Sequence, residues 1–401
     1  MKARILLLLI ALSEVLAVSA QAQTTPTDGN LFYTRYCGAG AHVRRTTFVF
    51  DGATFTLGAN VDVAFPPGAD GIAFAPDHDL LVGGQGNALH KINPMTGAFQ
   101  TQSSGGIIYH VMVDPAGNRV WGAGLPGQLS SFPLNPFGPG MVHGITGDDT
   151  QVVQVTWAGS TAFYTRSNPN GFGNFGTIDM TTFQTTRYLT GIAGAHGMAF
   201  DSMTGDLFLF GGSEIVQIDP TAPTVIKSSL DLSGSLTSTL DQGTVDGSGH
   251  AFVAENGGNL VFVDYSASGL IGNASNFVSV QFLDDCLDDI APLSGPGKEP
   301  PQCFTLNFST EDDMVTPLGN GQLIDTEFGS LVRISGSGAN LGPVTFDSDV
   351  GGPNDPSINT DMLVNHGNML LLQENAYPNQ SSPGFFDTVT DDVNGGDLIF
   401  D

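Results

Sequence analysis

The sequence predicts an all-β protein: a six-bladed β-propeller with velcro closure, followed by a C-terminal β-sandwich of jelly-roll type. A short apolar segment recurs five times at spacings of 40, 44, 42 and 46 residues, and strand-like segments follow each copy. Beyond residue 302 this repeat ends, but short alternating apolar runs continue. A repeat of this length with three or four strands is typical of propeller blades, which bury their faces by stacking around an axis.

The first 22 residues have the pattern of a secretory signal peptide. Lys2 and Arg4 precede an apolar run, and Ala20-Gln21-Ala22 fits a cleavage site of the A-x-A type. The apolar run is too short to cross a bilayer, and no later segment is long enough to do so. We therefore expect a bacterial-style exported protein that is secreted, periplasmic or on the cell surface.

The recurring segments are read as the inner strands of five blades. They are GIAFA (71–75), VMVDP (111–115), VTWAG (155–159), GMAFD (197–201) and GTVDG (243–247). The sixth blade has its outer strands at residues 31–36, 47–51 and 53–61, and it lacks an inner strand nearby. DDIAPLSG (288–295) supplies that strand, so the two ends of the repeat region close one blade. The expected propeller spans residues 28–295.

The units GIAFAPDHDLLVGG and GMAFDSMTGDLFLF resemble six-bladed propellers of the NHL and gluconolactonase/streptogramin-lyase type. The resemblance covers about two thirds of the chain. It implies the fold and leaves function open, because such folds include sensors, scaffolds, lyases and lactonases.

Aligned blades place one residue just before each inner strand, at one mouth of the central channel. These residues are Asp70, His110, Val153, His196, Gln242 and Asp289. The two histidines and two aspartates suit cation binding or acid–base chemistry. The alternative is that short polar residues cap the strand entries and bind water, which the apolar Val153 favours. The Glu and Asn/Asp ligand set of a gluconolactonase-type enzyme has no clear counterpart here.

Residues 296–302 form a Pro- and Gly-rich linker, and residues 303–401 form an acidic domain. This domain has 15 acidic residues and one basic residue, Arg333. Strands are expected at 303–309, 330–338, 344–350, 368–374 and 396–401, and the last one stops mid-pattern, as in a truncated chain. The stretches FSTEDDMVTPLGNGQLIDTEFGSLVRISG and GNMLLLQE resemble a module of exported bacterial proteins, which implies location more than activity.

Two acidic loops of this domain have the oxygen-rich composition of calcium sites. One contains Asp347, Asp349 and Asp355, and the other contains Asp391, Asn394 and Asp397, with Glu374 as an additional ligand. Neither loop matches an EF-hand, and solvated acidic loops are the alternative. Calcium is the one cofactor that the sequence suggests.

The three cysteines are Cys37, Cys286 and Cys303, which allow one disulfide in an oxidising compartment. Closure of the propeller brings Cys286 towards Cys37, but Cys303 is nearer along the chain. We expect the pair Cys286–Cys303.

A net charge of −28 argues against binding nucleic acid or an anionic membrane surface. The leading interpretation is an exported, non-catalytic binding or cell-surface protein whose partner is an extracellular protein or carbohydrate. The alternative is a propeller hydrolase or lyase, of lactonase type, with its site near His110 and His196. A third interpretation is a structural component of the envelope.

Overall fold

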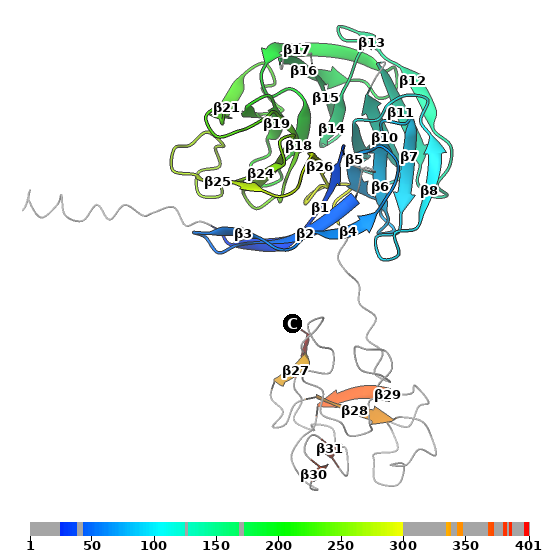
Figure 1. The fold of residues 1–401 in the computed structure, drawn as a ribbon, viewed down its shortest axis with the longest axis vertical. Helices are drawn as coiled ribbons and strands as arrows, with labels where there is room; N and C mark the ends of the chain where they lie inside the picture. Colours follow the sequence, from blue (N-terminus) through cyan, green and yellow to red (C-terminus); the bar gives the residue numbers. More distant parts are fainter. Residues whose placement is uncertain are drawn as a thin grey trace, which may run out of the picture. The chain divides into compact units, whose positions relative to one another are not determined.

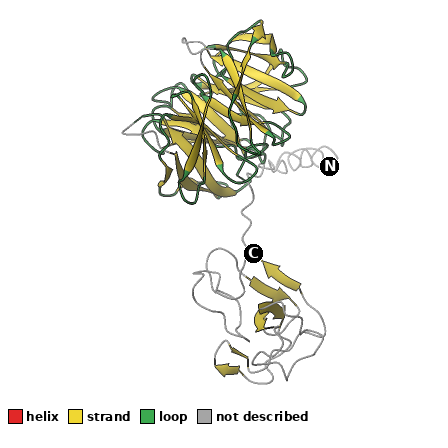
Figure 2. Ribbon diagram, turned by 90° about the vertical axis from the view of Figure 1, so that its right-hand side faces the viewer, coloured by secondary structure: helices red, strands yellow, loops and turns green. Residues whose placement is uncertain are grey.

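The structure is a computed structural model that describes residues 25–37, 43–124, 127–167, 172–299 and six short strands between residues 334 and 400. The chain divides into two compact units, Met1–Pro301 and Gln302–Asp401. The described residues form strands and loops without helices (Figure 2). Accordingly, this described part contains no helix with the length and apolarity needed to cross a membrane.

The first unit is a six-bladed β-propeller, as the sequence predicts (Figure 1). Blade 1 contains β26 (Leu287–Ile290), β1 (Thr27–Arg35), β2 (Val43–Phe50) and β3 (Phe55–Leu57), and β4 (Val61–Ala64) also pairs with β2. Blade 2 contains β5 (Ala69–Phe74), β6 (Leu80–Gly84), β7 (Ala88–Ile92) and β8 (Phe99–Ser103). Blade 3 contains β9 (His110–Val113), β10 (Arg119–Gly124), β11 (Gln128–Pro133) and β12 (Met141–Gly144).

The remaining three blades follow the same antiparallel order from the axis outward. Blade 4 contains β14 (Gln154–Ala158), β15 (Thr161–Ser167), β16 (Gly173–Ile178) and β17 (Gln184–Ile192), and β13 (Thr146–Gly147) pairs in parallel with β17. Blade 5 contains β18 (Gly197–Phe200), β19 (Leu207–Gly211), β20 (Glu214–Ile218) and β21 (Ile226–Asp231). Blade 6 contains β22 (Leu240–Val245), β23 (His250–Glu255), β24 (Asn259–Asp264) and β25 (Phe277–Phe282).

The predicted velcro closure is confirmed. β26 pairs with β1 in antiparallel fashion, with Tyr33 opposite Ile290. The backbone N–H of Ala291 continues the pairing by donating to the carbonyl of Phe32 at 2.8 Å. The strand at the end of the repeat region therefore completes the blade that the first strands begin.

The expected Cys286–Cys303 disulfide is wrong: Cys286 is bonded to Cys37. Cys37 lies two residues after the end of β1, and Cys286 directly precedes β26. Their Cα atoms are 5.6 Å apart, within the range that disulfide geometry requires. Spatial closure of the blade thus determines the pairing, and nearness along the chain does not.

The hydrophobic core lies between the blades. Six clusters of buried side chains each join two neighbouring blades, and together they form a ring. At the interface of blades 1 and 6, Phe55 stacks on Phe262 with ring centroids 4.1 Å apart. Burial of these aromatic and branched side chains is the main stabilising contribution to the propeller.

Three inner strands carry a β-bulge, in which two residues oppose one residue of the next strand. The bulges fall at residues 70–71 of β5, 241–242 of β22 and 288–289 of β26. Each bulge contains at least one aspartate. Bulges re-aim side chains and are common beside functional sites, so these three determine which groups face the channel.

In the second unit, the described strands are β27 (Ile334–Ser337), β28 (Pro343–Asp347), β29 (Asn368–Leu372), β30 (Gln380–Ser382), β31 (Phe385–Phe386) and β32 (Asp397–Phe400). They pair as β27–β32, β28–β29 and β30–β31. Four of the five predicted strands overlap these elements, and residues 303–309 lie outside the described residues. Arrangement of the strands in a β-sandwich stays a prediction.

Candidate metal centre

Two histidines stand at the entries of inner strands. His110 is the first residue of β9, and His196 directly precedes β18. At Gly71 a Cβ atom would lie 2.6 Å from the Cα of His110, so this glycine permits the close approach of β5 to β9. The close spacing of the inner strands therefore brings groups from different blades into contact.

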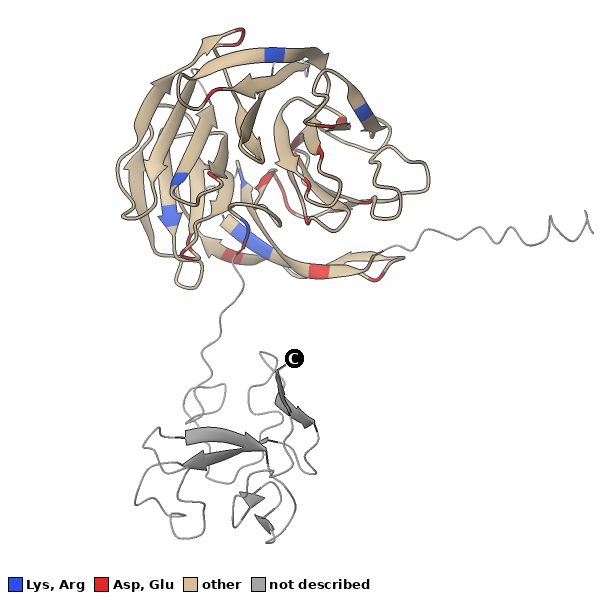
Figure 3. Cartoon of the chain, turned by 180° about the vertical axis from the view of Figure 1, so that it is seen from behind, with Lys and Arg blue, Asp and Glu red and all other residues tan. Residues whose placement is uncertain are grey.

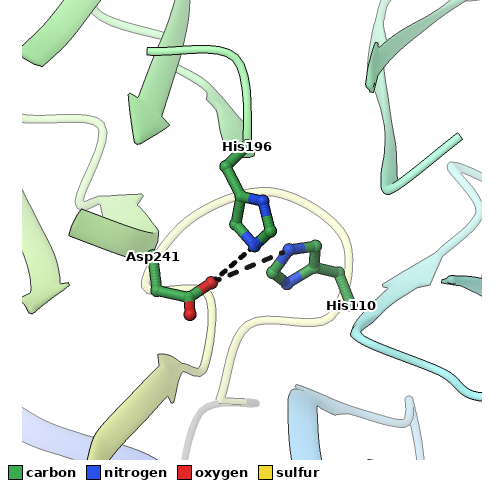
Figure 4. Close-up of side chains that lie close together, drawn as sticks. All are labelled: His110, His196 and Asp241. Carbon is green, nitrogen blue, oxygen red and sulfur yellow. Dashed lines mark ion pairs between the residues drawn. The ribbon is translucent and has the colours of Figure 1, made fainter. Parts of the chain in front are cut away.

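Both histidine rings face the carboxylate of Asp241 (Figure 4). The Nε2 atom of His196 lies 2.8 Å from Oδ1 of Asp241, and Nε2 of His110 lies 4.0 Å from the same oxygen. The two rings are nearly perpendicular, with centroids 4.8 Å apart. Two imidazole nitrogens and one carboxylate oxygen are a typical ligand set for a divalent transition metal.

His110 is held in a fixed orientation by Asp289. Its Nδ1 lies 2.9 Å from Oδ2 of Asp289, and the histidine side chain is only 1% exposed. Its Nε2 has no hydrogen-bond partner. A proton on Nδ1, donated to the carboxylate, leaves the Nε2 lone pair free for a ligand, as in the carboxylate–histidine pairs of metal sites.

A second group, the carboxylate trio, consists of Asp70, Asp288 and Asp289. One oxygen of each residue lies within 4.8 Å of the others, and all three side chains are buried. The amide of Gln85 donates to Oδ2 of Asp70 at 2.8 Å. No lysine or arginine of the described ranges forms an ion pair with the trio.

The pKa shifts reflect this burial of charge. Burial, together with the charge of nearby aspartates, raises the pKa of Asp70, Asp288 and Asp289 well above the usual range. Burial lowers the pKa of His110 and outweighs the attraction of Asp241 and Asp70. Burial also opposes ionisation of Asp241, but the charge and hydrogen bond of His196 prevail and lower its pKa to about 2. Such divergent shifts are typical of functional sites.

The structure brings together Asp70, His110, His196 and Asp289 of the predicted ring. Gln242 does not join them, because its Oε1 accepts a hydrogen bond from the backbone N–H of Met198 at 3.1 Å. Its neighbour Asp241, displaced by the bulge, provides the carboxylate instead. Val153 is apolar and contributes no ligand. Asp288 belongs to an acidic run visible in the sequence, but its inward position depends on the bulge in β26.

A small cavity lies farther along the inner strands. It has a volume of about 70 Å³ and is lined by residues of the inner strands β9, β14, β18 and β22, among them Met112, Trp157, Met198 and Phe200. Residues 292–296 contribute to its wall. Two hydrogen bonds fix this segment, from the N–H of Leu293 to Oγ1 of Thr244 at 2.9 Å and from Oγ of Ser294 to the carbonyl of Val245 at 2.7 Å. The cavity is too small for a ligand of more than a few atoms.

The calcium ligands expected in the second unit are not placed by the structure. Asp347 ends β28 and Asp397 begins β32, and only their backbone is described. Asp349, Asp355, Asp391, Asn394 and Glu374 lie outside the described residues, as does Cys303.

Lysines and arginines number only 12 in the whole chain, and those of the propeller are scattered over the blades (Figure 3). Asp and Glu number 40. The aspartates at the channel therefore lie in a protein that supplies few cationic partners of its own.

No family model matches the sequence, and no curated protein matches it. Among solved structures, the chain is similar to a structural genomics protein of unknown function from Bacteroides thetaiotaomicron. The identity is 12% and the TM-score is 0.45, over 67% of this chain and 88% of the other. This likeness carries no argument about function.

Proposed function

We propose that the propeller is a metal-dependent hydrolase or lyase whose metal is held by His110, His196 and Asp241 at the channel mouth. The observation that carries this proposal is the free Nε2 of buried His110, which faces Asp241 together with Nε2 of His196. An imidazole nitrogen buried without a partner is costly, and a metal ion removes this cost.

The ligand spacing supports this assignment. Tetrahedral zinc binds nitrogen at about 2.0–2.1 Å, which places two ligand atoms about 3.4 Å apart. The separations of 2.8 and 4.0 Å between the histidine nitrogens and Oδ1 of Asp241 lie on either side of this value, so a change of about 0.6 Å in each gives the tetrahedral spacing. Three protein ligands leave a coordination position open, where a bound metal activates water or polarises a carbonyl group.

The charge of the site narrows the class of substrate. Four aspartates surround the two histidines, and no lysine or arginine of the described ranges forms an ion pair with them. Apart from a bound metal, the site therefore offers an anionic substrate no cationic partner. A neutral substrate with a polarisable carbonyl group, such as a lactone or an ester, fits the site better.

A second candidate function is a binding protein in which the metal is structural. The burial of His110, whose side chain is only 1% exposed, favours this structural role. His196, by contrast, is 27% exposed. In this case the metal fixes the blades against one another, and an outer face of the propeller binds an extracellular protein or carbohydrate.

The test uses the purified mature protein, chelated and then reloaded with Zn²⁺, Mn²⁺ or Co²⁺. Metal content is measured by elemental analysis, and hydrolysis of neutral lactones and aryl esters is followed for each form. We expect one tightly bound transition-metal ion per chain and activity only in the loaded form. His196→Ala and Asp241→Asn each remove the metal, whereas His143→Ala, on the outer strand β12, does not.

The outcomes separate the two candidates. Metal binding without any turnover supports the structural role. Failure of His196→Ala to lower transition-metal content contradicts both.

Two expectations from the sequence also belong to this proposal: the type of propeller and the signal peptide. The lactonase-like propeller type accords with a mouth site, and the predicted signal peptide favours a location outside the cytoplasm. Calcium binding by an acidic β-sandwich in residues 303–401 is tested separately, by the calcium dependence of that domain's thermal unfolding.

A further inference from the structure

The carboxylate trio poses a problem of charge that the proposed transition-metal site does not solve. Asp70, Asp288 and Asp289 are 3%, 5% and 1% exposed. Transfer of a carboxylate from water to a buried position is costly unless it is paired with a cation or fully hydrogen-bonded. Three such groups within 4.8 Å of one another add mutual repulsion to this cost.

Few hydrogen bonds from the protein offset the cost of burying the three carboxylates. Asp70 accepts one hydrogen bond from Gln85, and Asp289 contacts His110 through one oxygen. Oδ2 of Asp288 and Oδ1 of Asp289 are buried without any hydrogen-bond partner. These are two free oxygen ligands inside the protein.

The positions of these oxygens are built by the fold. Asp70 lies in the bulge of β5, and Asp288 and Asp289 form the bulge of β26. The backbone N–H of Asp289 donates to Oγ1 of Thr34 at 3.1 Å, which fixes the bulge against β1. Two bulges in neighbouring inner strands thus direct three carboxylates to one point.

We propose that Asp70, Asp288 and Asp289 bind a second, hard divalent cation, of the Ca²⁺ or Mg²⁺ class, beside the transition-metal site. The ligands are all oxygens, as these cations prefer, and they contrast with the imidazole ligands of the first site. Ca²⁺ binds oxygen at 2.3–2.6 Å, so ligands up to about 5 Å apart can share one ion.

The two sites are linked through a single hydrogen bond. Asp289 offers one oxygen to the hard cation and accepts the Nδ1 proton of His110 with the other. A cation on Asp289 therefore fixes the residue that orients a ligand of the first metal. The second site exists independently of the transition-metal site, because none of its three ligands belongs to the first.

The experiment measures Ca²⁺ binding to the full mature chain by isothermal titration calorimetry after chelation. The test variant is Asp70→Asn/Asp288→Asn, which keeps Asp289 and hence the orientation of His110. The control variant is Asp219→Asn/Asp231→Asn, which removes two carboxylates of blade 5 outside the trio: the half-buried Asp219, which follows β20, and the exposed Asp231, which ends β21. Any calcium binding by residues 303–401 is common to all three proteins, so the difference between the proteins is the relevant quantity.

We expect the test variant to bind one Ca²⁺ fewer per chain than wild type, and the control variant to bind the same number. Thermal unfolding gives a second readout. Chelated wild type should melt below the chelated test variant, since the amides remove the repulsion, and the rise on adding Ca²⁺ should be smaller in the test variant.

Equal stoichiometry in wild type and the test variant, with equal responses of the melting temperature to Ca²⁺, overturns the proposal and means that protons neutralise the trio. His196→Ala distinguishes the two sites. If that variant keeps the full Ca²⁺ stoichiometry, the hard-cation site stands even when no transition metal binds.

Discussion

The disulfide between Cys37 and Cys286 offers a sharp test of how the propeller is held closed. The two cysteines are 249 residues apart in sequence, so the bond encloses almost the whole propeller. A cross-link stabilises a protein mainly by restricting the unfolded chain, and the effect grows with the logarithm of the loop length. For a loop of this size the relation gives about 5 kcal/mol at 25 °C.

The perturbation is the double substitution Cys37→Ser/Cys286→Ser, which avoids leaving a reactive thiol. We expect the free energy of unfolding to fall by up to about 5 kcal/mol. Equilibrium unfolding in guanidinium chloride, followed by Trp fluorescence, measures this change. Reduced wild type should behave like the variant.

Cys303→Ser is the matched control, because Cys303 is outside the bond, and it should unfold like wild type. Peptide mapping under non-reducing conditions should recover the Cys37–Cys286 pair. A loss of less than about 1 kcal/mol in the double variant would mean that the entropic account is wrong for this ring. A mapped Cys286–Cys303 pair would refute the closure geometry itself.

Three further predictions follow from other parts of the propeller. Gly71→Ala places a methyl carbon 2.6 Å from the Cα of His110, so it should weaken transition-metal binding about tenfold and destabilise the fold by about 1 to 3 kcal/mol. Calorimetry measures the metal affinity and thermal unfolding measures the stability. Gly86→Ala, with open space around the added methyl group, should change neither. Burial lowers the pKa of His250, but hydrogen bonding and the charge of neighbouring aspartates raise it above the ordinary value. The stability that protonated His250 contributes should thus be complete below about pH 6.5 and lost as pH rises through the folded-state pKa. A His250→Gln variant with the same pH profile of stability as wild type in urea unfolding would contradict this. Asp284→Asn leaves two arginines without their shared carboxylate and should cost about 2 to 3 kcal/mol, with an unchanged urea midpoint as the opposing result.

The sequence is informative about the propeller because each blade repeats the same local pattern. Strand alternation and turn residues locate the inner strands, and the unpaired edge of β1 requires a partner from the far end of the repeat. Blade 1 is predicted from this requirement even though β1 and β26 lie more than 250 residues apart.

The candidate site could be predicted only in part from the strand pattern. His110 and His196 are found because regular strands keep the alignment of the blades. Asp241 is missed in favour of Gln242 because a bulge shifts the register by one residue. A bulge depends on how a strand fits its neighbours, and the local pattern of apolar residues does not record it. The disulfide is missed for a related reason, since its pairing depends on spatial closure.

The late arrival of β26 has a consequence for the time at which the protein can fold. The ribosome makes β1 first and its partner about 250 residues later, a delay of roughly 10 to 50 s at ordinary rates of synthesis. During this interval the inner edge of β1 is unpaired, and the ring of blades has no final member. The position of one four-residue strand thus postpones completion of the ring until almost the whole propeller has been synthesised.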